Sequence, residues 1–294
     1  MKMPDIMGKM DIAFPHLSIY IENLPKKITV FGFDIAFYGM ILALSVLAGL
    51  IMMNREAKVT GQNPDMYWDF AMYAIFFSIC GSRIYYVIFS WDNYKDNLLS
   101  IFNLREGGIA IYGTVIGAFT TLFIYAKIKK VSPFLMADTG VPALILGQII
   151  GRWANFMNRE CFGGYTDNPL AMRLPIEAVR KSDISADLSA HIAEGTNYIQ
   201  VHPTFLYESL WNVGILTFMM LYRKHKKFNG ELALVYLGGY GLGRFWIEGL
   251  RTDQLLIPHT NIAVSQMLGI TMFVVAVAVD VVVRIRMKKK DKMV

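Results

Sequence analysis

Long apolar stretches dominate the chain and alternate with short polar segments. A helix that crosses the hydrocarbon core of a bilayer needs about 20 mostly apolar residues, with every backbone group hydrogen-bonded inside the segment. Stretches of this kind predict about seven membrane-spanning helices, at 33–53, 67–89, 107–126, 134–153, 204–221, 232–249 and 263–283. The pattern therefore predicts an all-α polytopic membrane protein, with 1–294 as a single integral membrane domain.

Basic residues indicate the orientation, because Lys and Arg in short loops next to helix ends are retained in the cytoplasm. They gather in alternate loops, around Arg55 and Lys58, at 127–130, at 223–227 and in the tail at 284–292. An odd number of spans then puts the N-terminus outside and the C-terminus in the cytoplasm. Topology explains the net charge of +6. We expect no nucleic-acid partner, since no DNA-binding motif accompanies these clusters.

Two polar segments are too long for simple turns. Residues 155–202 are rich in Gly, Asn, Asp and Pro, and we expect a small extracytoplasmic head there. Residues 1–32 form an external N-terminal segment, in which the strand-like stretches 19–22 and 28–31 flank the turn-prone stretch 23–26. This arrangement suits a small hairpin or a segment lying on the surface.

Charged side chains at membrane depth are the first functional candidates, because each costs roughly 2.5–3.5 kcal/mol at a helix centre. Arg152 and Asn155 are three residues apart and share a face if the fourth helix extends that far. A guanidinium can hold a phosphate through two parallel hydrogen bonds. The alternative is an interfacial arginine that reaches up to the lipid headgroups.

Two more clusters lie in the fifth and sixth spans. Arg244, Glu248 and Arg251 follow at i, i+4 and i+7, which predicts one helix face carrying either an ion pair beside an anion site or a purely structural pair. His202, Tyr207 and Glu208 open the fifth span. We expect an arginine partner for Glu208, whereas Tyr207 has the alternative role of anchoring the helix at the interface.

Glycines mark the start of the third span, at Gly107, Gly108, Gly113 and Gly117. They permit close approach of backbone or headgroups, although helix packing alone would explain Gly113 and Gly117. In the predicted topology, the polar clusters of spans three to six all lie near the outer leaflet. Their convergence predicts one site there.

These segments resemble the prolipoprotein diacylglyceryl transferase family over nearly the whole chain. The most specific stretch is 151–160 with the following Gly163 and Gly164, and similar stretches occur at 37–39, 107–113, 202–208 and 243–248. The resemblance implies seven transmembrane helices in a bacterial inner membrane, with the active site facing the outer leaflet. It also implies transfer of diacylglyceryl from phosphatidylglycerol to the lipobox cysteine of prolipoprotein signal peptides, forming a thioether and releasing glycerol phosphate, as the first step of lipoprotein maturation.

The chemistry needs a thiolate as nucleophile and stabilisation of a departing phosphate. Our hypothesis therefore assigns Arg152 and Arg244 to the phosphate. The expected substrate-binding residues are Tyr38, Asn155, Asn158, Gly163, His202 and Tyr207. The expected residues for orienting the arginines or accepting a proton are Glu160, Glu208 and Glu248.

Tyr112 departs from the pattern, because many family members carry histidine there. An unperturbed tyrosine titrates near 10, so Tyr112 either has its pKa lowered by nearby cations or donates a hydrogen bond to a headgroup oxygen. We expect the second role. No cofactor is expected, because the nucleophile comes from the substrate. No metal is expected either, since the chain has no His-Glu-x-x-His motif.

Two rival functions remain open. Intramembrane Arg and Glu can line the path of a transporter for an anionic solute, but these charges lie near one face and no paired repeat is visible. An intramembrane protease would need a zinc motif or a Gly-x-Ser-x-Gly elbow, and the sequence has neither.

Overall fold

The computed structural model describes residues 3–103, 107–257, 260 and 262–291. Within these ranges, the helices of 18 residues or more are α1 (Phe37–Val59), α2 (Pro64–Phe89), α3 (Ile111–Lys129), α4 (Pro133–Asn158), α6 (Thr204–Tyr222), α7 (Glu231–Glu248) and α8 (Val264–Asp291). In the described part of the chain, 5 are long and apolar enough to cross a membrane, namely α1 to α4 and α8. The protein is thus a mainly helical, multi-pass membrane protein. Crossing by α6 and α7, and hence a total of seven, stays a prediction.

The chain divides into two compact units, each with its own core. The first unit contains Met1–Gly49, Leu144–Lys226 and Leu234–Val294, and the second contains Leu50–Ala143 and Lys227–Ala233. The long helices α1 and α4 each contribute residues to both units. A single integral membrane domain over 1–294 stays a prediction.

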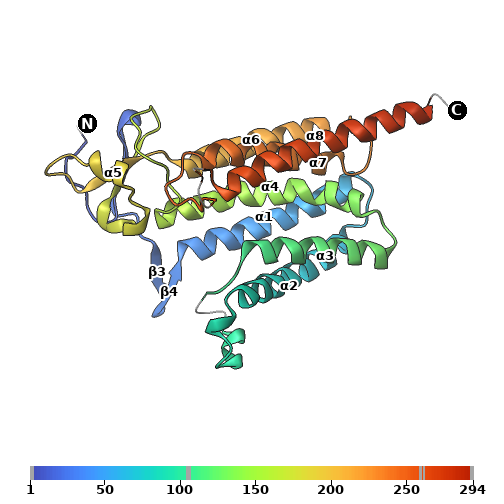
Figure 1. Ribbon diagram of the computed structural model, residues 1–294, viewed down its shortest axis with the longest axis horizontal. Helices are drawn as coiled ribbons and strands as arrows, with labels where there is room; N and C mark the ends of the chain where they lie inside the picture. The colour runs from blue at the N-terminus through green and yellow to red at the C-terminus, as the bar shows by residue number, and fades with distance from the viewer. Residues whose placement is uncertain (1–2, 104–106, 258–259, 261, 292–294) are drawn as a thin grey trace. The chain divides into compact units, whose positions relative to one another are not determined.

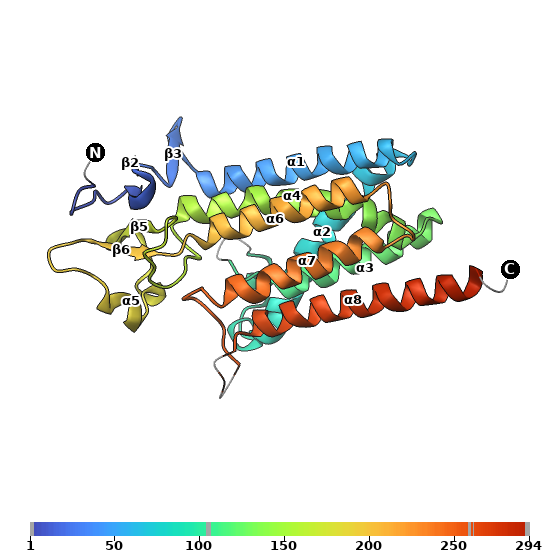
Figure 2. The same cartoon turned by 90° about the horizontal axis from the view of Figure 1, so that it is seen from above.

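A four-stranded antiparallel sheet, which we call the head sheet, lies in the first unit. It consists of β1 (Ile12–Phe14), β2 (Ile19–Ile21), β5 (Met172–Pro175) and β6 (Tyr198–Val201), in the order β2-β1-β5-β6. Figure 2 shows β5, β6 and the short helix α5 (Ala186–Ala190) beyond the ends of α4 and α6. Both predicted external segments therefore build one sheet, because Ala13 pairs with Arg173.

Apolar side chains from this sheet and the adjoining helix ends form the core of the first unit. Ile12, Leu174 and Ile199 are buried from the strands, while Phe156 and Phe205 come from the end of α4 and the start of α6. The two phenylalanine rings lie 4.8 Å apart between centroids. Burying these rings fixes the ends of α4 and α6 against the sheet.

The predicted hairpin in the N-terminal segment was wrong in its pairing. Residues 19–21 pair with 12–14, and β3 (Lys27–Val30) pairs with β4 (Phe33–Ala36). The turn falls at Phe31 and Gly32, whose φ angles of 49° and 83° suit a tight reversal. Residues 33–36 are consequently a strand, and α1 begins at Phe37 rather than at 33. The fold is mainly helical, as predicted, but these two sheets mean that it is not all-α.

Close packing of α2 on α3 organises the second unit. A Cβ atom built on Gly113 would lie 2.2 Å from the carbonyl oxygen of Gly81, and one on Gly117 would lie 2.4 Å from that of Phe77. No real side chain fits at those distances. The helix-packing interpretation of Gly113 and Gly117 is thereby confirmed.

Arg83 of α2 is buried inside a loop of the second unit. Its guanidinium donates to the carbonyl oxygens of five residues at 2.6–3.1 Å, namely Ser100, Ile101, Asn103, Gly107 and Gly108. All five N–H donors of the side chain are used in this way. A Cβ atom on Gly108 would lie 2.2 Å from Nη1 of Arg83, so the glycine is required for this approach.

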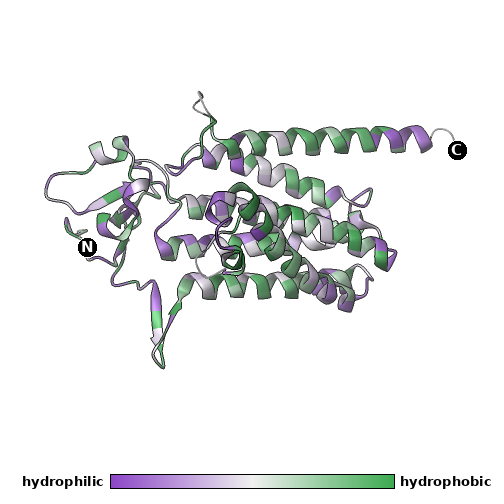
Figure 3. Ribbon diagram, turned by 60° about the horizontal axis from the view of Figure 1, so that its bottom comes forward, coloured by the Kyte–Doolittle hydropathy of each residue, from purple (hydrophilic) through white to green (hydrophobic). Residues whose placement is uncertain are grey.

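The C-terminal helix α8 is apolar along most of its length and polar at its end (Figure 3). The polar end carries Arg284, Arg286, Lys288, Lys289 and Lys290. Lys292, which also belongs to the predicted cytoplasmic tail, lies outside the described residues.

Candidate active site

The candidate site lies where α4 ends, α6 begins and α7 ends, next to the head sheet (Figure 1). After Asn158 the chain reverses through Arg159 and Cys161, which have φ angles of 55° and 57°. The Thr204 hydroxyl then donates to the carbonyl oxygen of Cys161 and ties the start of α6 to this turn. The polar residues of α4, α6 and α7 meet because these three ends are fixed together.

One carboxylate joins two arginines from different helices. Oε1 of Glu208 in α6 lies 2.7 Å from Nη2 of Arg152 in α4 and 3.3 Å from Nη1 of Arg244 in α7. The Glu208 side chain is only 3% exposed, whereas those of Arg152 and Arg244 are 20% and 17% exposed. The predicted arginine partner of Glu208 is confirmed, and there are two of them.

Further charges extend this set towards the chain after α7. Arg244 Nη2 lies 2.5 Å from Glu248 Oε2, as the spacing predicted, and Arg251 Nη1 lies 3.7 Å from the same oxygen. Arg251 in turn binds Asp253 through two hydrogen bonds of 2.9 and 2.7 Å. We call these six residues, Arg152, Glu208, Arg244, Glu248, Arg251 and Asp253, the arginine network.

The expected helix face was wrong for Arg251, because α7 ends at Glu248. Arg251 instead forms an isolated antiparallel β-bridge with Gly163. Burial alone would lower the pKa of Arg251, but the hydrogen bond to Asp253 and the surrounding negative charges raise it. Burial would raise the pKa of Asp253, yet its bond to Arg251 lowers it. The Arg251–Asp253 pair therefore remains charged, and it is the last ion pair of the arginine network along the chain.

A second carboxylate lies beside Arg152. The helix α4 extends through Asn155, as the predicted shared face required, and Asn155 Oδ1 lies 3.5 Å from Arg152 Nη1. Its amide donates to Glu160 Oε1 at 2.9 Å, while Arg180 Nη2 lies 3.4 Å from Glu160 Oε2. Tyr38 of α1 is near enough to Glu160 and Arg152 to interact with their charges. The expected residues Tyr38, Asn155 and Glu160 therefore gather around Arg152.

The two arginines that share Glu208 keep hydrogen-bonding capacity. Among the described residues, the Nε–H groups of Arg152 and Arg244 have no hydrogen-bond partner. The two guanidinium groups are partly exposed, share one carboxylate oxygen and each keep an unused N–H donor. Together they form a positively charged edge. A phosphate can bind there through charge-assisted hydrogen bonds, while the buried carboxylates hold both guanidinium groups in place.

His202 and Tyr207 belong to a separate hydrogen-bonded triad with Asn168. The Asn168 amide donates to the Tyr207 hydroxyl at 2.8 Å, and this hydroxyl lies 3.2 Å from His202 Nδ1. Burial lowers the pKa of His202, so the ring is neutral. The Asn168 amide nitrogen, which can only donate, lies 3.4 Å from His202 Nδ1, so we assign Nδ1 as an acceptor and the ring proton to Nε2. His202 and Tyr207 thus face one another, and Tyr207 directly precedes Glu208 on α6.

Gly163 and Asn158 lie outside the arginine network, and their roles in substrate binding stay predictions. Gly163 packs between two backbones, since a Cβ there would lie 2.7 Å from both His202 Cβ and the Leu250 carbonyl oxygen. The geometry supports a packing role for Gly163. Asn158, the last residue of α4, makes no hydrogen bond with another side chain in the described ranges.

Tyr112 lies in the first turn of α3, in the second unit, and is 43% exposed. Its ring lies 6.1 Å from that of Tyr85. Its contribution to the arginine site stays a prediction.

Sequence reasoning missed Asn168, Arg180 and Asp253, which all contribute polar contacts here. Asp253 follows Arg251 by two residues, a spacing that allows a local bidentate pair and could have identified it. Asn168 and Arg180 lie in the irregular head segment, where no periodicity relates them to a helix face. Among described residues, no group of three or more His, Cys, Asp and Glu side chains is placed to hold a metal ion.

Comparisons with known proteins identify the family of the chain. Residues 25–282 match the family described as Prolipoprotein diacylglyceryl transferase. A protein of Clostridioides difficile named phosphatidylglycerol–prolipoprotein diacylglyceryl transferase is 39% identical over 243 residues, which cover 82% of this chain and 89% of that protein.

Two further relatives carry the same enzyme name. One, from Clostridium perfringens, is 38% identical over 91% of this chain and 97% of its own length. Another, from Listeria monocytogenes, is 39% identical over 90% of this chain and 91% of its own. With a family match over most of its length and relatives of this similarity, the chain belongs to the prolipoprotein diacylglyceryl transferase family.

Proposed function

We propose that this protein transfers the diacylglyceryl group of phosphatidylglycerol to the cysteine thiol of prolipoprotein signal peptides, the first step of lipoprotein maturation. Family membership and the names of the relatives support the reaction. The observation that carries our assignment of the site is the pairing of Arg152 and Arg244 on one oxygen of Glu208.

The reaction makes one bond and breaks one. The cysteine sulfur, as a thiolate, attacks the glycerol carbon that bears the phosphate ester, and a carbon–sulfur bond forms. The carbon–oxygen bond to phosphate breaks, and its electron pair leaves with glycerol phosphate. The thiol proton passes to a base. No oxidant or reductant is needed.

Arg152 and Arg244 stabilise the departing phosphate in this mechanism. Negative charge grows on the bridging oxygen as the bond breaks, and fixed cationic donors lower the energy of that state more than that of the bound lipid. Glu208 and Glu248 hold the two guanidinium groups, because their oxygens lie at 2.5–3.3 Å from them. They are positioning residues.

Glu160 is our candidate for the proton acceptor. Its arginine contact, at 3.4 Å from Arg180, is longer than that between Glu208 and Arg152, and its side chain is 16% exposed against 3% for Glu208. A partly exposed carboxylate can be reached by a substrate thiol, as a proton acceptor must be. Tyr38 and Asn155, which neighbour Glu160 and Arg152, are placed to bind headgroup oxygens, and we retain Asn158 and Tyr112 as headgroup ligands to be tested.

We further propose that the site faces the outer leaflet of the bacterial inner membrane. The basic end of α8 supports a cytoplasmic C-terminus, because clustered Lys and Arg next to a span stay inside. Within the first unit, the arginine network lies at the head-sheet end of the helices, and the basic end of α8 lies at their opposite end.

The test is mass spectrometry of a lipobox peptide incubated with the purified protein and phosphatidylglycerol vesicles. We expect the cysteine to gain the mass of a diacylglyceryl group, and we expect Arg152→Ala or Arg244→Ala to abolish the gain while the protein remains folded. Cleavage of the peptide, or no mass change with wild-type protein, would overturn the proposal. Near-normal transfer by both variants would overturn the site assignment.

A further inference from the structure

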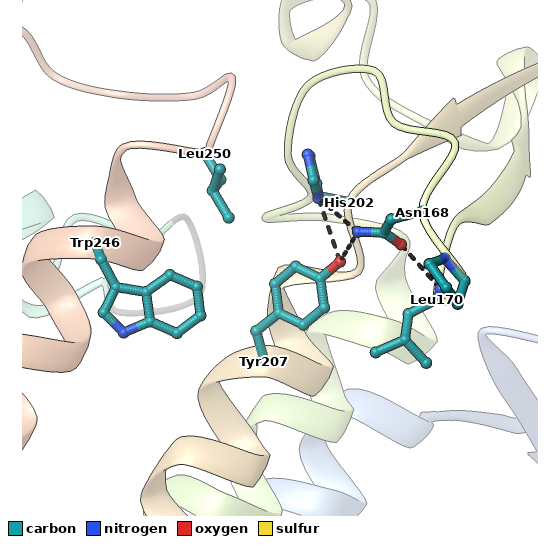
Figure 4. Close-up of a pocket in the computed structure, with 7 residues that line it drawn as sticks. Asn168, Leu170, His202, Tyr207, Trp246 and Leu250 are labelled. Carbon is teal, nitrogen blue, oxygen red and sulfur yellow. Dashed lines mark hydrogen bonds between the residues drawn. The ribbon is translucent and has the colours of Figure 1, made fainter.

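An open cavity of about 440 Å³ lies next to the arginine network in the first unit. Its lining residues are Asn168, Pro169, Leu170, His202, Tyr207, Trp246 and Leu250. Figure 4 shows the Trp246 ring facing Tyr207, with Leu170 and Leu250 on opposite sides. We call this cavity the aromatic slot. Its walls are apolar apart from the triad of Asn168, His202 and Tyr207.

The slot and the network share helix turns but not faces. Tyr207 directly precedes Glu208, Trp246 lies two residues after Arg244, and Leu250 directly precedes Arg251. On α6 and α7, residues one or two apart point in different directions, whereas Leu250 and Arg251 lie just beyond the end of α7. A molecule in the slot therefore lies beside Arg152 and Arg244. Atoms of that molecule just outside the slot can reach the positively charged edge formed by the two guanidinium groups.

The rim of the slot offers N–H donors that are not used by the described residues. The Asn168 amide nitrogen is within hydrogen-bond distance of Tyr207 and His202, and its oxygen accepts from the Leu170 backbone N–H at 2.9 Å. His202 Nδ1 lies 3.2 Å from the Tyr207 hydroxyl and 3.4 Å from the Asn168 amide nitrogen, which can only donate, so we assign Nδ1 as the acceptor. Nε2–H of His202 and Nε1–H of Trp246 then have no partner among the residues that the structure describes. An apolar cavity with a few N–H donors at its rim suits an apolar side chain next to a backbone carbonyl.

We propose that the aromatic slot binds an apolar side chain of the acceptor peptide, close to the reacting cysteine, with His202 Nε2–H donating to a carbonyl of that peptide. This inference rests on the proposed function. It adds a binding site for the acceptor that is distinct from the phosphate-binding arginines.

Lipid acyl chains fit the slot less well. An acyl chain is already surrounded by hydrocarbon in the bilayer, so moving it into an apolar cavity gains little. Three lining residues, Asn168, Pro169 and Leu170, belong to the segment between α4 and β5, outside the long helices. An apolar peptide side chain at that level would otherwise face water, and its burial is worth about 1.5–3 kcal/mol.

The experiment changes the size of the slot and follows peptide selectivity. Leu170→Trp fills the slot and Leu170→Ala enlarges it, while Leu255→Trp alters a leucine that is 71% exposed and does not line the slot. The substrates are lipobox peptides in which one residue near the cysteine at a time is Ala, Leu or Phe. Transfer from phosphatidylglycerol vesicles is measured by mass spectrometry.

At one peptide position, we expect Leu170→Trp to raise the KM for the Leu and Phe peptides about tenfold relative to the Ala peptide. We expect Leu170→Ala to shift the preference among the three peptides towards the Phe peptide. The KM for phosphatidylglycerol should stay unchanged, and Leu255→Trp should behave as wild type. We expect His202→Phe to raise the KM of every peptide.

Two results would overturn the inference. One is an unchanged size preference at every peptide position in both Leu170 variants. The other is a change in KM for phosphatidylglycerol, or in its acyl-chain preference, with KM for the peptide constant, which would assign the slot to the lipid. Transfer by wild-type protein in either case leaves the proposed function intact, whereas no transfer by wild type contradicts the function itself.

Discussion

Arg83 and Arg244 are both largely buried arginines on long helices, yet their partners differ in kind. Arg83 uses all its donors on backbone carbonyls, and the structure describes no carboxylate within ion-pair distance of it. Arg244 lies between the carboxylates of Glu208 and Glu248 and keeps a free Nε–H among the described residues. A saturated guanidinium holds a loop, whereas an incompletely used one can still bind a ligand.

Arg159 and Arg152, seven residues apart, repeat the contrast in the kind of partner, although the buried Nε–H of Arg159 also has no partner among the described residues. Arg159 is 2% exposed and donates to the carbonyl oxygens of Met157, Met10 and Leu24. It thereby fastens the N-terminal segment to the end of α4. Arg152 pairs with Glu208 and faces the candidate site. Partner type, together with the greater exposure of Arg152 and Arg244, separates the structural arginines from the proposed catalytic ones.

The largest expected effect is on catalysis by Arg152 and Arg244. Lysine keeps the charge but loses the planar pair of donors. We expect Arg152→Lys and Arg244→Lys each to lower kcat by about 100-fold or more, as for loss of a donor to a developing oxyanion, with little change in thermal unfolding midpoint. Vesicle-based transfer kinetics and unfolding in detergent measure the two quantities. Normal turnover by either variant contradicts its assignment to the phosphate.

Replacing Arg83 should instead lower the stability of the protein. Lysine has three donors for the five carbonyls, and each unpaired buried carbonyl costs about 1–3 kcal/mol. We therefore expect Arg83→Lys to destabilise the protein by about 2 kcal/mol or more, measured as a lower thermal unfolding midpoint. An unfolding midpoint equal to that of wild type would show that the loop does not depend on this side chain.

The glycine contact between α2 and α3 gives a smaller effect in the same unit. Gly113→Ala inserts a methyl group against the Gly81 carbonyl, and overpacking of this kind costs about 1–3 kcal/mol. Gly140→Ala is the matched control, because nothing lies within 4 Å of the position its Cβ would take. We expect a lower unfolding midpoint for Gly113→Ala only. Equal midpoints would rule out tight packing at this contact.

The smallest effect concerns Asp11, which interacts with Arg159. Burial would raise the pKa of Asp11, but hydrogen bonds from the backbone N–H groups of Asn23 and Gly8 and from the Tyr20 hydroxyl lower it. Its contribution to stability is thus present above the unfolded pKa of about 4 and lost as pH falls through the lowered folded value. We expect Asp11→Asn to be less stable than wild type near neutral pH, with the gap closing below about pH 4. A gap that is constant with pH contradicts this.

Hydropathy located the long helices because the cost of placing polar groups in a membrane acts on each segment separately. The Arg244–Glu248 pair was predictable for the same reason, since four residues make one helical turn. The pairing of Ala13 with Arg173 was not predictable, because no local pattern specifies a strand partner so distant in sequence. The contact of Arg152 and Arg244 with one oxygen of Glu208 likewise depends on how three helix ends meet.

The sequence also did not reveal whether an arginine has backbone carbonyls or carboxylates as its partners. Arg83 and Arg152 both lie in or next to apolar stretches, and the cost of burial makes each a candidate. Only the fold distinguishes them, because the carbonyls around Arg83 come from an irregular loop between α2 and α3.

Binding of glycerol phosphate, the proposed leaving group, tests the central claim most directly. Titration of the detergent-solubilised protein, followed by calorimetry, compares wild type with Arg152→Lys, Arg244→Lys and the control Arg159→Lys. We predict affinity at least about tenfold weaker in the first two variants, corresponding to loss of a charge-assisted hydrogen bond, and wild-type affinity in the folded control. Equal affinity in all four proteins, or weakening in the Arg159 variant alone, would contradict the assignment of Arg152 and Arg244 to the phosphate.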